Sequence, residues 1–314
     1  MKITHKILLI SILTGLFSGC AAQLAAPKAA PLKLALLPIL DVMPIYVAQE
    51  AGFFEKQGLK VEFVPVGSAA EREQVVAAGQ ADGMVNDLLS VALYNRKDTQ
   101  VQMVQFARIT AAGAPLYCIV ASKQSGIKTV KDLAGVAIGI SQGTIIDYVT
   151  NQVLISQGLQ PDQIQTLAVP KLPDRLALLI SGQLKAATLP EPFSTEAVQQ
   201  GAVLIVDDTG YPDIANSVIS FRKKVLDEQP QAVQKFLAAI NQAVNEINNH
   251  PETWRKILDT YKLVPANLVQ TYPIPKFPAA SLPTQQQFDA VVQWAIAKGM
   301  IDQKVDYASS VKTP

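Results

Sequence analysis

The sequence predicts an α/β protein in which two related units form two similar lobes. Short continuous apolar runs alternate with segments of helical periodicity, which indicates mostly parallel sheets flanked by helices. An internal repeat is the second observation: Gln-Gly-Leu at residues 57–59 recurs at 157–159, and Ala-Gly-Gln at 78–80 recurs as Ser-Gly-Gln at 181–183. The matches keep their order while their spacing drifts, which favours a diverged duplication over chance similarity.

The first unit supplies one wall of a predicted pocket. An apolar run at residues 34–37 predicts a buried strand, and the loop after it ends at Pro44, a favoured residue in the first turn of a helix. Ser68 and Glu71 form a capping box that starts a second helix. Further strands are predicted at residues 61–64, 82–85, 136–140, 203–206 and 218–221. Because α/β sheets bind ligands beyond the carboxyl ends of their strands, the loops at those ends are the candidate site.

The second unit repeats this arrangement and is followed by a helical C-terminal part. Thr144 and Asp147 resemble a weaker capping box, which predicts a helix from about Ile145. Arg175 of this unit matches Arg72 of the first unit. After the repeats, a Pro-rich segment at residues 273–283 is expected to run along the surface.

Composition describes a well-packed globular protein. Hydrophobic residues make up 49% of the 314 residues and charged residues 17%, with a formal net charge of +1. A nucleic-acid-binding protein would need a basic face or stripe, and this balance gives no case for one. Nucleic acid is therefore not an expected partner.

The N-terminus predicts export and lipid attachment. A basic head precedes an apolar run at residues 7–17 that is too short to span a bilayer, and small residues then precede Cys20. This order resembles a bacterial lipoprotein cleavage site. We predict a signal peptide over residues 1–19, a lipidated Cys20 and a tether over residues 20–31. The alternative is an ordinary signal peptide that ends near a cysteine.

These segments together resemble a known family. The matching stretches are PIYVA at 44–48, GFF at 52–54, GLKV at 58–61, AGQAD at 78–82, DLAGVAIG at 132–139, SQGT at 141–144, PQAV at 230–233 and HPETW at 250–254. In this order they resemble the substrate-binding proteins of bacterial ABC importers, in the branch with sulfonate-, taurine-, nitrate- and thiamine-pyrimidine-binding members. The resemblance implies a two-lobed fold like that of type II periplasmic binding proteins, with the ligand in the cleft between the lobes.

The resemblance also implies boundaries and partners. Lobe 1 is expected at residues 32–117 and 217–314, and lobe 2 at residues 118–216. The implied partners are a small-molecule ligand, an ABC permease with a cytoplasmic ATPase, and a membrane reached through lipid on Cys20. The protein is expected to be a monomer outside the cytoplasm, anchored on the periplasmic side or the outer face, without a cofactor.

One enzyme motif competes with the binding interpretation. Residues 139–143 read G-x-S-x-G between a predicted strand and helix, which is the context of a hydrolase nucleophile at Ser141. An acid and His250 follow in the required order. However, His5 leaves with the signal peptide, so His250 is the single mature histidine, and it ends a helix. An exported serine hydrolase therefore remains a remote alternative, and no catalytic residue is assigned. A metal site is not expected either, because one histidine and Cys118 do not form a set of metal ligands.

The charges of the candidate loops predict the kind of ligand. The ionisable residues of the four main loops (37–44, 85–90, 141–147 and 189–193) are all acidic. A sulfonate or nitrate pocket would gain from Arg or Lys. The acidic bias thus favours a neutral or cationic organic ligand, such as a nitrogen heterocycle like a thiamine-precursor pyrimidine. An anion binder of the same fold, or a ligand sensor without a transporter, are the alternatives.

The predicted ligand-binding residues come from these loops and their neighbours. They are Asp41, Met43, Tyr46, Ser68, Asn86, Asp87, Thr110, Ser141, Gln142, Gly143, Thr144, Asp147, Glu191 and Phe193. Glu191 is the strongest candidate, because it lies between two prolines in a stiff loop after a strand. Asp87 and Asp147 have an alternative role as helix caps, and Tyr46 an alternative place in the core.

Overall fold

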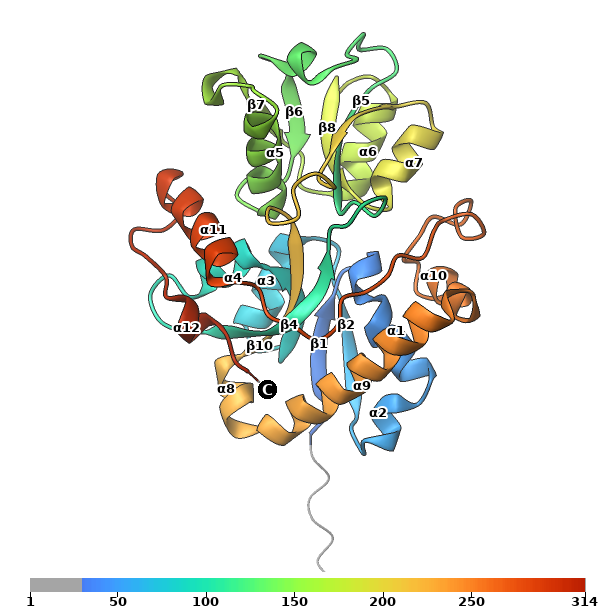
Figure 1. Cartoon of the computed structure of the whole chain (residues 1–314), viewed down its shortest axis with the longest axis vertical. Coiled ribbons are helices and arrows are strands. Elements are labelled where there is room, and N and C mark those ends of the chain that lie inside the picture. Colours follow the sequence, from blue (N-terminus) through green and yellow to red (C-terminus); the bar gives the residue numbers. More distant parts are fainter. Residues whose placement is uncertain (1–29, 314) are drawn as a thin grey trace, which may run out of the picture. The chain divides into compact units, whose positions relative to one another are not determined.

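The computed structural model describes residues 30–313, and two five-stranded sheets flanked by helices lie within that range (Figure 1). This arrangement confirms the predicted two-lobed α/β class. We call each sheet with its helices a lobe, numbered in chain order. The predicted signal peptide, Cys20 and nearly all of the predicted tether lie outside the described residues.

The first sheet is mixed and has a parallel half. Its strands are β1 (Leu32–Leu36), β2 (Val61–Pro65), β3 (Gly83–Asp87), β4 (Val101–Ile109) and β10 (Asn216–Arg222). They lie in the order β2-β1-β3-β10-β4. β1 pairs in parallel with β2 and β3, whereas β10 is antiparallel to both of its neighbours. The carboxyl ends of β1, β2 and β3 therefore meet at one edge, where the first group of predicted loops begins.

The second sheet repeats the topology of the first. Its strands are β5 (Tyr117–Ala121), β6 (Ala137–Ile140), β7 (Gln165–Ala168), β8 (Ala186–Pro190) and β9 (Val203–Asp207). The order is β7-β6-β8-β5-β9, with β6 parallel to β7 and β8, and β5 antiparallel to both of its neighbours. The two sheets thus match strand for strand, as a duplication would require.

Local sequence signals explain where the helices begin. The helices are α1 (Met43–Glu50), α2 (Phe53–Lys56), α3 (Ala69–Ala77), α4 (Leu88–Tyr94), α5 (Ile145–Ser156), α6 (Leu172–Ile180), α7 (Phe193–Gln199), α8 (Lys223–Glu228), α9 (Pro230–Asn249), α10 (Arg255–Thr260), α11 (Gln285–Ala297) and α12 (Tyr307–Ser310). Pro44 lies in the first turn of α1, and Ser68 Oγ accepts the amide N–H of Glu71 at 3.1 Å to cap α3. No helix within residues 30–313 is both long enough and apolar enough to cross a membrane.

Two buried arginines hold corresponding positions in the two lobes. Arg72 of α3 donates to the carbonyl oxygen of Val85, the third residue of β3, at 3.0 Å. Arg175 of α6 donates to the carbonyl oxygen of Thr188, the third residue of β8, at 2.8 Å. The repeat seen in the sequence therefore extends to side-chain contacts, which join α3 to the first sheet and α6 to the second sheet.

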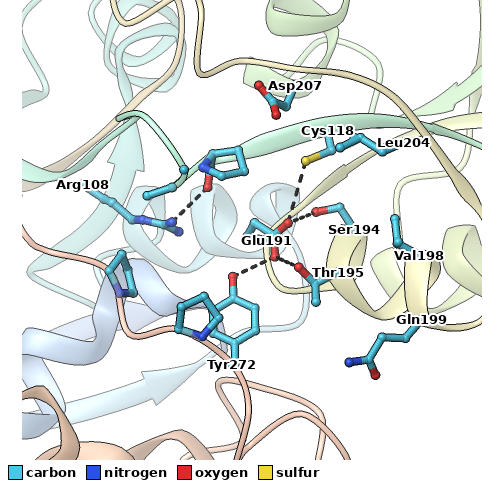
Figure 2. Close-up of a pocket in the computed structure, with 15 residues that line it drawn as sticks. Arg108, Cys118, Glu191, Ser194, Thr195, Val198, Gln199, Leu204, Asp207 and Tyr272 are labelled. Atoms are coloured by element: carbon cyan, nitrogen blue, oxygen red, sulfur yellow. Dashed lines mark hydrogen bonds between the residues drawn. The ribbon is translucent and has the colours of Figure 1, made fainter. Parts of the chain in front are cut away.

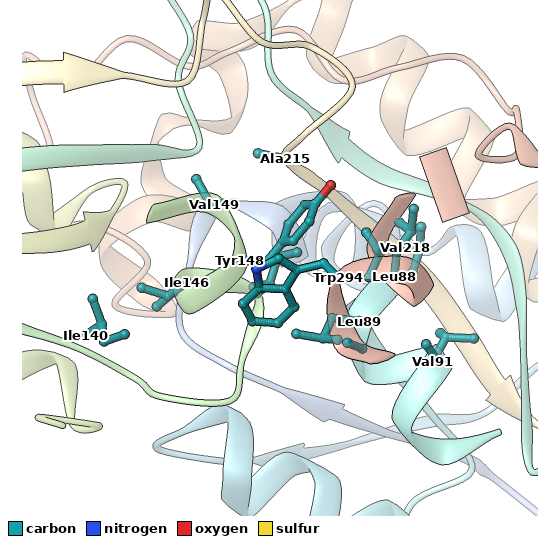
Figure 3. Close-up of a cluster of buried hydrophobic side chains, with 14 of the residues drawn as sticks. Leu88, Leu89, Val91, Ile140, Ile146, Tyr148, Val149, Ala215, Val218 and Trp294 are labelled. Carbon is teal, nitrogen blue, oxygen red and sulfur yellow. The ribbon is translucent and has the colours of Figure 1, made fainter. Parts of the chain in front are cut away.

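The hydrophobic core is continuous from one lobe to the other on one side. α11 places Trp294 against Tyr148 of α5, with ring centroids 5.4 Å apart at 79° (Figure 3). Leu88 and Leu89 of α4 belong to the same buried cluster, which also includes Ile140 of β6. Apolar packing around α11 thus joins the two lobes.

Candidate functional site

Five of the fourteen predicted ligand-binding residues line one of two pockets: Glu191 lines the first, and Asp87, Gln142, Gly143 and Thr144 line the second. The first, here called the Glu191 pocket, has a volume of about 400 Å³ and contains Glu191 and Arg108. The second, here called the α3–α4 pocket, has a volume of about 580 Å³ and contains Asp87 and residues 142–144. Both pockets take residues from both lobes. The predicted residues that line a pocket therefore lie in two separate spaces.

The Glu191 pocket is built by five segments that are far apart in the chain. They are the end of β4 with the connection to β5, β5 itself, the β8–α7 turn with α7, β9, and the segment after α10. The last segment contributes Tyr272, Pro273 and Pro275. The Pro-rich segment was expected to run along the surface. Instead its beginning lines the pocket. Phe277 packs in the hydrophobic core of lobe 1, and its backbone N–H donates to Asn248 Oδ1 at 2.9 Å.

The Glu191 carboxylate lies at the centre of a ring of donors (Figure 2). It is only 5% exposed. Its Oε2 accepts hydrogen bonds from Thr195 Oγ1 and the Tyr272 hydroxyl, each at 2.7 Å. Its Oε1 accepts from Ser194 Oγ and more weakly from Cys118 Sγ at 3.8 Å. A buried carboxylate needs such partners, because desolvation without them is costly.

The donors around Glu191 keep their protons. Burial, followed by the nearby Glu191 charge, raises the pKa of the Tyr272 phenol. The same two causes, in the same order, raise the pKa of the Cys118 thiol well above its ordinary value. Both groups therefore remain neutral donors, and the carboxylate is the acceptor of the group.

Arg108 brings a positive charge into this pocket that the sequence analysis did not count. It is 2% exposed, and its Nη2 donates to the Pro115 carbonyl oxygen at 2.9 Å. Its Nη1 lies 3.4 Å from Asp41 Oδ1, so the predicted Asp41 is half of an ion pair. Arg108 Nε is buried and has no hydrogen-bond partner among residues 30–313. Arg108 was not among the predicted site residues, because it lies inside the apolar strand β4 and the predicted residues were chosen from loops.

Four of the predicted residues act as helix caps. Ser68 caps α3, and Asp87 caps α4 by accepting the Ser90 amide N–H at 2.8 Å. Thr144 Oγ1 caps α5, and Asp147 accepts the amide N–H of residue 143 at 3.0 Å. Asp87 also lies 3.4 Å from the Arg72 guanidinium. The alternative role weighed for Asp87 and Asp147 is thus the one observed, and neither is a free carboxylate.

Three further predicted residues are held inside lobe 1. Met43 is fully buried, and Tyr46 stacks on Tyr261 with centroids 3.7 Å apart. Asn86 Oδ1 accepts from Ser220 Oγ at 2.7 Å. Neither pocket is lined by any of these three residues.

The polar side chains of the G-x-S-x-G motif, Ser141 and Gln142, make hydrogen bonds to other residues of lobe 2. Ser141 Oγ donates to the Pro170 carbonyl oxygen at 3.1 Å and accepts a hydrogen bond from Arg175. Gln142 Nε2 donates to Thr166 Oγ1 at 3.3 Å. The partner of Ser141 is thus a guanidinium, which cannot serve as the general base of a hydrolase.

The last two predicted residues, Thr110 and Phe193, line neither pocket. Thr110 Oγ1 donates to Asp208 Oδ1 at 3.0 Å, which links the two crossing connections between the lobes. Phe193 begins α7 and packs on the small apolar cluster of lobe 2. Within the described part of the chain, no three His, Cys, Asp or Glu side chains lie close enough together to hold a metal ion.

Two α/β lobes of matching topology, with a buried polar pocket contacted from both, define the class of two-lobed periplasmic binding proteins. The alkanesulfonate-binding protein SsuA of Xanthomonas axonopodis pv. citri, solved with MOPS bound, shares this fold at a TM-score of 0.76 and 19% identity. The match covers 92% of this chain and all (100%) of that one. The desulfurization enzyme DSZB also shares the fold, at a TM-score of 0.67 and 14% identity over 90% of this chain and 96% of its own.

The chain belongs to the NMT1/THI5-like family, whose model matches residues 40–254, more than half of the sequence. A Haemophilus influenzae protein named as a thiamine biosynthesis protein is 27% identical over 229 residues, 71% of this chain and 70% of that one. A Bacillus subtilis protein named as an aliphatic sulfonates-binding protein is 26% identical over 306 residues, 93% of this chain and 89% of that one. The family resemblance inferred from the sequence is confirmed.

Proposed function

We propose that this protein is an extracytoplasmic solute-binding lipoprotein that takes a small organic ligand in the Glu191 pocket and delivers it to an ABC importer. The family and the fold support the binding role, and the partners would be a permease and its cytoplasmic ATPase. The protein would change no covalent bond of its ligand.

The observation that carries the proposal is the Glu191 carboxylate, buried in a pocket that both lobes line. Asp207 lines the same pocket, and the one guanidinium there, Arg108, is paired with Asp41. Carboxylates therefore outnumber cations around this space. A neutral or cationic ligand with N–H or O–H donors suits it, and a nitrogen heterocycle such as a thiamine-precursor pyrimidine is our leading candidate.

Cleft closure supplies the mechanism in this proposal. Lobe 1 (residues 32–117 and 217–314) contributes Arg108 and Tyr272, and lobe 2 (residues 118–216) contributes Glu191. A ligand that contacts both lobes binds the closed form more tightly than the open form, and so shifts the population towards closure. A permease that recognises the closed form would then receive loaded protein selectively.

One observation favours a second candidate, an anion binder of the same fold. Arg108 Nε is a buried donor without a partner in residues 30–313, and an anionic oxygen is a suitable acceptor for it. Against this candidate, an anion in the pocket would also lie near Glu191 and Asp207.

Identification of a co-purifying ligand tests the proposal. The protein would be purified without denaturant, and its bound small molecules would be released and identified by mass spectrometry. We expect a neutral or cationic nitrogen-containing molecule, recovered chemically unchanged after incubation. A sulfonate or nitrate would support the anion binder instead, and conversion of the molecule during incubation would support an enzyme.

Membrane attachment through Cys20 is the remaining part of the proposal. In a bacterial host, the protein is expected in the membrane fraction with a mass increased by acyl chains. The Cys20→Ser variant would leave the membrane fraction. Unchanged fractionation of that variant would leave an ordinary signal peptide as the better interpretation of the N-terminus.

A further inference from the structure

The α3–α4 pocket is a second pocket, open to solvent, which the proposed ligand site does not use. It lies between α3 and α4 of lobe 1, and the turn that starts α5 of lobe 2 also lines it. Its volume of about 580 Å³ is larger than that of the Glu191 pocket. Part of its lining is apolar, including Leu89, Leu93 and Ile145. A compact apolar body therefore fits this space.

Glu73 lines this pocket, and one oxygen of its carboxylate is a buried acceptor without a partner among residues 30–313. Its Oε1 accepts from Arg72 Nη2 at 2.6 Å, Arg72 Nε at 3.1 Å and Ser90 Oγ at 2.8 Å. These bonds fix the orientation of the carboxylate. Its Oε2 is buried and accepts no hydrogen bond from any residue between 30 and 313. Because buried carboxylate oxygens are rarely left unpaired, this oxygen is suited to a donor from a bound molecule.

The charges around Glu73 indicate which donor fits best. Arg72 is shared between Glu73 and Asp87, so two carboxylates face one guanidinium; the side chains of Arg72 and Asp87 are buried, and that of Glu73 is 30% exposed. Arg96 and Lys97 also line the pocket, but both are exposed, and solvent and salt screen their charges. The group around Glu73 therefore has an excess negative charge, which favours a cationic N–H donor over a neutral one.

We propose that the α3–α4 pocket binds a small primary amine. Its ammonium group donates to Glu73 Oε2, and its apolar body packs on Leu89, Leu93 and Ile145. This site is separate from the Glu191 pocket and does not depend on the function proposed for that pocket.

Calorimetric titration with benzylamine tests the site, with benzyl alcohol as the uncharged probe of similar shape. We expect benzylamine to bind the protein at least ten times more tightly than benzyl alcohol. The Glu73→Gln variant should lose at least tenfold in affinity for benzylamine, because it keeps the shape of the side chain but not its charge. The control variant Glu55→Gln changes an exposed glutamate of α2 and should bind within twofold of the parent.

A second variant keeps the proposal testable if Glu73→Gln fails to fold. Ala77 lines the same pocket one helical turn after Glu73, so Ala77→Leu should fill the space without touching the carboxylate. We expect it to abolish benzylamine binding while thermal unfolding stays close to that of the parent. No binding to the parent, or equal binding to Ala77→Leu, would overturn the site. Loss of benzylamine binding in Glu191→Ala but not in Glu73→Gln would assign the amine to the Glu191 pocket, whose own ligand is tested independently by co-purification.

Discussion

The Tyr272 hydroxyl donates a 2.7 Å hydrogen bond to Glu191 Oε2, and this bond joins the segment after α10 in lobe 1 to the end of β8 in lobe 2. Both side chains are buried, and both line the candidate ligand pocket. The carboxylate proposed to recognise the ligand therefore also makes a contact between the lobes. In the proposed mechanism, a ligand donor that binds Glu191 would act directly on this contact between the lobes.

Removal of the Tyr272 hydroxyl should weaken the protein measurably. Tyr272→Phe keeps the ring but takes one donor from a buried carboxylate, so we expect the free energy of unfolding to fall by about 1–3 kcal/mol. Urea unfolding followed by circular dichroism would measure it. The matched control is Tyr261→Phe, whose hydroxyl donates to the exposed Glu50 at 2.6 Å and should contribute less than about 1 kcal/mol. Equal losses in the two variants would contradict a special role for the Tyr272 bond.

Glu191 should control ligand affinity. In Glu191→Ala the buried acceptor is gone, and we expect at least tenfold weaker binding of the molecule identified by co-purification, measured by calorimetric titration. Glu196→Ala is the control, because Glu196 lies in α7, the helix that follows Glu191, and its side chain accepts a hydrogen bond from Gln200 at 3.2 Å. If Glu191→Ala binds the molecule as tightly as the parent, the ligand lies elsewhere.

Asp208 should make stability depend on pH. Its carboxylate accepts from Thr110 Oγ1 and from the amide N–H groups of Leu116 and Tyr117 at 3.0–3.1 Å. Burial, only partly offset by these bonds, raises the pKa of Asp208 to about 6. The unfolded chain releases this proton near pH 4, so between about pH 4 and 6 the folded state holds more protons. The contribution of Asp208 to the unfolding free energy therefore falls as pH rises through this window, by roughly 3 kcal/mol in total.

The Asp208→Asn variant isolates that contribution. Unfolding free energies would be measured from pH 4 to 7 for the parent and the variant, and the difference between the two curves should change by the stated amount. Asp213→Asn, at an exposed position, should leave the pH profile of the parent unchanged. Parallel curves for the parent and Asp208→Asn would contradict the raised pKa.

Trp294 should be the main apolar link between α11 and lobe 2. Trp294→Ala leaves a large void beside Tyr148, and we expect a loss of about 3–5 kcal/mol in unfolding free energy. Trp254, which is only partly buried, provides the control, and Trp254→Ala should cost clearly less. Denaturant unfolding of both variants checks the prediction. A smaller loss of unfolding free energy for Trp294→Ala than for Trp254→Ala would contradict the role of Trp294 as the main apolar contact between α11 and lobe 2.

Most of the fold was predictable from neighbouring residues. The strand periods, the first-turn Pro44 and the capping box of Ser68 act over a few positions, so the sequence contains the whole cause. The repeat also aligned Arg72 with Arg175, and this match corresponds to two equivalent buried contacts in the structure. The same reasoning singled out Glu191, which lines a pocket in the structure, because a carboxylate between two prolines after a strand is recognisable from its neighbours alone.

The pairings of the candidate site were decided only by the tertiary structure. Arg108 meets Asp41 across 67 positions of the chain, and Tyr272 meets Glu191 across 81. No local pattern marks such pairs, because they form only when β4 enters the first sheet and the segment after α10 reaches lobe 2. The sequence by itself determined the lobes, their helices and the acidic loops. The tertiary structure decides which carboxylates pair with a buried arginine and which one lines a pocket. These outcomes depend on desolvation and on the distances between charges, and the folded chain sets both of these quantities.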